Sequence, residues 1–111
     1  MFLKHSLFST LKSSKKDTQK IILQWIDKNQ RYSSKNWEID ILAKRIIAWI
    51  SNSRLTYEDG NIDYKDKFNG IIKKQINHLI NEIETSELIS DKIIGCSAII
   101  LSSIHSDFSI S

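Results

Sequence analysis

The sequence predicts an all-α protein, and three observations support this fold class. Isoleucine, leucine and tryptophan recur at three- and four-residue spacing along most of the chain, which is the period of one helical face. The 111 residues include no proline and only three glycines, so little in the sequence interrupts a helix. A chain of this length is expected to form one helical domain, 1–111, with a buried core.

The N-terminal part predicts two helices, over 4–12 and 15–29. Leucines four residues apart mark one face of the first helix. The second begins after Ser14, which with Asp17 has the form of a capping box. Its apolar side chains, including Ile22 and Ile26, fall on one side, which is typical of an outer-layer helix.

The central segment predicts a helix over 37–52 that is apolar around most of its circumference. The residues of its main face are Ile39, Leu42, Ala43, Ile46, Trp49 and Ile50, and Ile41, Ile47 and Ala48 extend it. Such a helix is expected to be covered on more than one side. The neighbouring segments, or another chain, must supply that cover.

Two further helices are expected, over 64–84 and 91–105. A turn around Gly60, with positive φ available to the glycine, precedes the first, and Asp63 is its expected cap. Gly70 inside this helix predicts a close approach by a neighbouring helix.

The last helix contains apolar residues on most sides together with several small ones, and Cys96 is expected to be a small buried side chain. Two such apolar helices in so short a chain suggest that some apolar surface is left uncovered.

Several residues of these helices match a known family in order and spacing. They are Trp25, Ile26, Trp37, Asp40, Arg45, Ile46, Trp49, Ile50, Phe68, Gln75, His78, Leu79, Gly95 and Ala98. Over roughly residues 15–104 the chain thereby resembles the N-terminal helical region of the heparinase II/III-like polysaccharide lyases. The resemblance implies antiparallel helical hairpins that form part of an (α/α) toroid.

By the same resemblance, the complete protein would cleave an anionic, uronic-acid-containing polysaccharide by β-elimination. Its downstream toroid helices and a β-sandwich domain would lie outside these 111 residues. The family's catalytic residues also lie downstream, so none is assigned here. The segment would be a scaffold that is inactive by itself.

Three residues are candidates for contact with such a substrate: Trp37, Arg45 and His78. Trp37, at a helix start, could stack on a sugar ring or pack in the core. Arg45 could hold a uronate carboxylate by two hydrogen bonds, or pair with Asp40, Glu38 or an acid on an adjacent helix. His78 could act as a base, or be an ordinary surface or hydrogen-bonded histidine.

Composition leaves a second function open. The net charge of +3 and the pI near 9.0 permit an anionic partner. The basic residues are spread along the chain and interleaved with acids, so nucleic acid is not a favoured partner. The alternative to the lyase scaffold is a small stand-alone helical module that binds a partner protein or nucleic acid.

The sequence contains no phosphate loop and no dinucleotide fingerprint, so no cofactor is expected. One cysteine excludes an internal disulfide and a multi-cysteine metal site. The three histidines are far apart in sequence, so no metal is expected. No signal peptide is evident, no apolar stretch is long enough to span a membrane, and the compartment is not specified.

Overall fold

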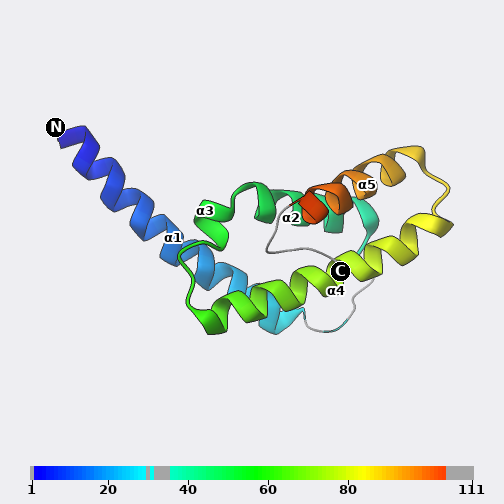
Figure 1. The fold of residues 1–111 in the computed structure, drawn as a ribbon, viewed down its shortest axis with the longest axis horizontal. Coiled ribbons are helices and arrows are strands. Elements are labelled where there is room, and N and C mark those ends of the chain that lie inside the picture. The colour runs from blue at the N-terminus through cyan, green and yellow to red at the C-terminus, as the bar shows by residue number, and fades with distance from the viewer. Residues whose placement is uncertain (1, 30, 32–35, 105–111) are drawn as a thin grey trace.

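The computed structural model describes residues 2–29, 31 and 36–104, with side chains from Ser14 onward (Figure 1). Its helices are α1 (Phe2–Lys28), α2 (Ile39–Ser51), α3 (Ser53–Thr56), α4 (Ile62–Thr85) and α5 (Ile89–Ile104). No strand occurs in these ranges, and the predicted all-α class is confirmed.

The first helix differs from the prediction. α1 is continuous where two helices, 4–12 and 15–29, were expected, so Ser14 does not cap a helix start. The physical reason is that neither glycine nor proline occurs within α1, while serine and aspartate cost only a few tenths of a kcal/mol inside a helix. Figure 1 shows the N-terminal half of α1 projecting away from the other helices.

The other predicted helices correspond to α2, α4 and α5, with described ends shifted by at most two residues. The predicted end at residue 105 lies outside the described residues. The short helix α3, which follows Asn52, was not predicted.

α2 occupies the centre of the structure, in contact with α3, α4 and α5. Its side chains Leu42, Ala43 and Ile46 are fully enclosed. α4 contributes the opposite wall of the core with Phe68 and Ile72, which are also fully enclosed. The expected cover of the central helix on more than one side is therefore present.

The start of α4 is capped by a residue other than the predicted Asp63. The Asn61 side chain accepts a hydrogen bond of 2.8 Å from the backbone N–H of Tyr64. An asparagine at this position satisfies one of the free N–H groups of the first turn, as Asp63 would have done two residues later. Gly60 does not adopt a positive φ.

Gly95, and not Gly70, marks the close approach of two helices. A Cβ atom on Gly70 would meet nothing within 4 Å, whereas one on Gly95 would lie 2.5 Å from Cδ1 of Ile83. α5 thus packs closely on α4, to which it is joined by the link 86–88, and Figure 1 shows the two helices running in opposite directions.

α5 is covered on one side only. Gly95, Ala98 and Ser102 are its buried residues, and they face α2 and α4. Cys96 is exposed, so its expected burial is wrong. Cys96 follows the buried Gly95, and each residue of an α-helix is rotated by about 100° about the helix axis, so the thiol lies on the flank of α5 and not on its buried side.

Candidate functional site

Two of the three candidate substrate-binding residues lie together at a surface cavity. Trp37 precedes α2 and His78 lies on α4, and their rings meet edge to face with centroids 5.5 Å apart. Both line a cavity of about 430 Å³ between the start of α2, the second half of α4 and the start of α5. Arg45 is not among the residues that line it.

Acidic side chains dominate the rim of this cavity. Glu38, Asp40, Glu82 and Asp91 line it, and no described lysine or arginine does. The carboxylates of the cavity would repel the carboxylate of an anionic sugar, and this repulsion is stronger where water is partly excluded because the effective dielectric constant is lower. An anionic sugar is therefore disfavoured at the place where Trp37 and His78 meet.

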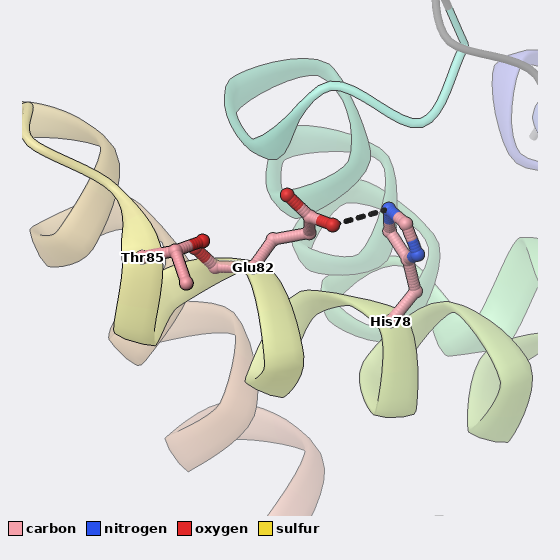
Figure 2. Close-up of polar contacts among 3 residues, drawn as sticks. All are labelled: His78, Glu82 and Thr85. Carbon is pink, nitrogen blue, oxygen red and sulfur yellow. Dashed lines mark hydrogen bonds and ion pairs between the residues drawn. The ribbon is translucent and has the colours of Figure 1, made fainter.

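His78 and Glu82 lie one turn apart on α4 (Figure 2). His78 Nε2 is 3.9 Å from Glu82 Oε1, and this contact is an ion pair only when His78 is protonated. Thr85 continues the same row, and its hydroxyl donates a 3.2 Å hydrogen bond to the backbone carbonyl of Glu82. The four-residue spacing of His78 and Glu82 was visible in the sequence as a signal for this contact.

Trp37 belongs to the core by its burial. Only 3% of its surface is exposed. Stacking on a sugar requires an open ring face, and such a face is not available at this exposure. Of the two roles considered for Trp37, the structure therefore agrees with packing in the core and not with stacking on a sugar ring.

Arg45 is held by partners within the chain. Its Nη1 donates a 2.8 Å hydrogen bond to Gln75 Oε1, and its Nη2 donates one of 2.8 Å to the backbone carbonyl of Asn36. The guanidinium carbon lies 4.2 Å from the centre of the Trp25 ring, a cation–π distance. Arg45 thus joins α1, α2 and α4, through neutral partners and not through the acids considered from the sequence.

The surroundings of Arg45 also affect its ionisation. Burial lowers the pKa of Arg45 to about 10, because desolvation disfavours the charged form. The guanidinium is still charged at neutral pH. With two hydrogen bonds and a ring contact already made, it is not oriented to bind an external carboxylate.

A metal centre is not formed by the described residues, in which no group of three or more histidine, cysteine, aspartate or glutamate side chains is placed to hold an ion. Of the three histidines, His78 alone has a described side chain. None of the described helices is both long and apolar enough to cross a membrane.

The most conspicuous surface feature lies on α5. Four isoleucines on its outward face are 74%, 63%, 59% and 76% exposed, and we call them the outer isoleucine row: Ile89, Ile93, Ile100 and Ile104. They fall opposite Gly95 and Ala98, the buried side of the helix. The sequence indicated uncovered apolar surface, and the largest group of exposed isoleucines lies on this face.

Comparison with known proteins adds no relative: no family model, no curated protein and no solved structure matches the chain. The resemblance to the heparinase II/III-like lyases stays a prediction.

Proposed function

We propose that this chain is a helical interaction module, and that the outward face of α5 binds a helix of another protein chain. The observation that supports this function best is the outer isoleucine row, four large apolar side chains left mostly in water on one helical face. Leaving them exposed forgoes roughly 1–2 kcal/mol each relative to burial. An amphipathic partner helix recovers that free energy by covering the row.

The α5 face suits a protein partner in its chemistry as well as in its apolar area. The row carries no charged residue along its centre, and the nearest charge on the exposed side of α5 is Lys92 at its edge. Interfaces between proteins are depleted of charge at their centre in the same way. A nucleic acid would require a basic surface, which this face does not offer.

A two-hybrid screen with the chain as bait, and with the chain itself among the preys, tests this proposal. The bait is compared with Ile93→Asp and Ile100→Asp, which place a charge in the row, and with Ile62→Asp as a matched control. Ile62 is 78% exposed at the start of α4, away from the row. We expect preys that are lost with both row variants and retained with the control.

Preys bound equally by all four baits would contradict the proposal, and so would a screen in which no prey distinguishes the row variants from wild type. Circular dichroism of each purified variant establishes that the comparison is between folded proteins. Hydrogen exchange of α5 amides with and without a purified prey then locates the contact.

A second candidate function is the scaffold role in a heparinase II/III-like lyase. It is favoured by the same exposed face, because the next helix of an (α/α) toroid would pack against α5. The acidic side chains that line the cavity would repel an anionic polysaccharide, which disfavours direct contact with it at Trp37 and His78.

The scaffold role is tested by the coding sequence beyond Ser111 and by an activity assay. A reading frame that continues into further alternating helices and a β-sandwich would support it, and a stop codon directly after Ser111 would exclude it. The 111 residues alone are expected to release no unsaturated uronate from heparan sulfate or alginate. Release of that product would show that they hold an active site.

A further inference from the structure

We infer that the partner of the α5 face is a second copy of this chain, bound through antiparallel pairing of the two α5 helices. This inference rests on the proposed interaction function and names its partner. The positions in the outer isoleucine row are what point to this partner. The midpoint between Cys96 and Ser97 is equally far in sequence from Ile93 and Ile100, and equally far from Ile89 and Ile104.

That arrangement makes the row symmetric under reversal of the helix direction. When two copies of α5 cross antiparallel at this midpoint, Ile93 lies opposite Ile100 of the second copy, and Ile89 lies opposite Ile104 of the second copy. The two helices together then form four contacts between isoleucines, two of each kind. An isologous two-fold interface needs such self-complementarity, because both subunits present the same patch.

The residues at the crossing point are small. Cys96 and Ser97 are both exposed, and they flank the centre of the row where the two helices would come closest. Small side chains at a crossing point let helix axes approach, so that the larger residues on either side can interdigitate. Large residues there would have held the outer isoleucines apart.

Burial of this face would leave the hydroxyl groups of Ser97 and Ser103 hydrogen-bonded. Ser97 Oγ donates to the backbone carbonyl of Ile93 at 2.9 Å, and Ser103 Oγ donates to that of Ile99 at 2.9 Å. These bonds lie within α5 and persist in a dimer. Burial of these two hydroxyl groups therefore carries no desolvation penalty for an unpaired hydroxyl.

The size of the face sets the expected strength. α5 has 16 residues and is about 24 Å long. One face of such a helix is smaller than the roughly 800 Å² per partner of a standard interface. We therefore expect a reversible dimer with a dissociation constant on the order of micromolar, not an obligate one.

Sedimentation equilibrium over a wide concentration range tests the dimer. Wild type is expected to pass from monomer to dimer, while Ile93→Asp and Ile100→Asp each weaken the dimer about tenfold or more by placing a carboxylate against apolar side chains. Ile62→Asp should leave the dissociation constant unchanged. Thermal melts of dilute, monomeric samples verify that the row variants are folded.

Disulfide trapping tests the antiparallel register. In a Cys96→Ser background, Ile89→Cys and Ile104→Cys variants are mixed and oxidised with diamide, which takes up the two electrons and two protons released as each disulfide forms. An antiparallel pair predicts mainly crosslinks between the two different variants. Homodimeric crosslinks between like positions would overturn the register.

The outcomes separate this inference from the proposed function. Wild type that is monomeric at all concentrations overturns the second copy as partner. In that case, a two-hybrid prey that is lost with Ile93→Asp leaves the interaction function standing. A dimer that is indifferent to both row variants overturns the assignment of α5 as its interface.

Discussion

Replacement of Gln75 by leucine is predicted to destabilise the fold through Arg45, which lies thirty residues away in sequence. Gln75 is fully buried, its Oε1 accepts from Arg45, and its own amide donates to the backbone carbonyl of Ile71 at 3.2 Å. Leucine has a similar size but cannot accept a hydrogen bond. Arg45 would then keep its charge and its burial while losing one of its two acceptors.

The structure sets the expected magnitude. A hydrogen bond from a charged donor contributes about 1.5–3 kcal/mol, so Gln75→Leu should lower the free energy of unfolding by roughly that amount. Arg45→Met loses both hydrogen bonds and the contact with Trp25, and it leaves the buried Gln75 oxygen unpaired; a loss of about 2–4 kcal/mol is expected.

The double variant should lose less than the sum of the two single losses. With Arg45 and Gln75 both apolar, neither the charge nor the amide oxygen is left without its partner. A double-mutant cycle from urea unfolding at neutral pH measures this coupling free energy, which we expect to be about 1.5–3 kcal/mol.

Additive losses, or an Arg45→Met variant as stable as wild type, would refute the structural assignment of Arg45. Either result would return Arg45 to the role of a side chain available for a carboxylate ligand. Equal m-values among the four proteins would show that the comparison reports on the folded state and not on a change in the unfolded chain.

Two further predictions concern stability. Gly70→Ala should raise the free energy of unfolding by about 0.5–1 kcal/mol, because the site is open and alanine favours a helix. Gly95→Ala brings a Cβ against Ile83, so this variant should be less stable than Gly70→Ala by at least about 1 kcal/mol. Equal effects of the two substitutions in thermal melts would contradict the close contact between Gly95 and Ile83. Burial raises the pKa of Tyr64, whose hydroxyl donates to the Thr56 carbonyl, so the unfolded chain ionises first and stability falls as pH rises. The stability of wild type minus that of Tyr64→Phe should fall by up to about 1.4 kcal/mol per pH unit above about pH 10, and a constant difference would disagree with burial of Tyr64.

Much of the fold could be predicted from apolar periodicity, because α2 and α4 bury side chains that recur at helical spacing. The break within α1 was predicted wrongly, since Ser14 and Asp17 resemble a cap but are also tolerated inside a helix. Capping residues indicate a helix start only where the preceding segment is not itself helical.

The site was predictable only in part. Periodicity showed that the last helix is apolar on most sides, but it could not show which side α2 and α4 cover. That depends on Gly95, whose role in helix contact looks no different in sequence from that of Gly70. The partners of Arg45 were missed for a related reason: Gln75 and Asn36 come from other segments, and local spacing carries no information about them.

Pairing of two copies of the chain through the outward face of α5 is tested most directly by the alkylation rate of Cys96. Cys96 is the only cysteine of the chain, is exposed, and lies beside the centre of the outer isoleucine row. We predict that its rate of reaction with iodoacetamide falls as the protein concentration rises through the dimer dissociation constant, and that Ile93→Asp abolishes this fall. A rate that is the same at every concentration, for wild type and variant alike, would contradict pairing through this face.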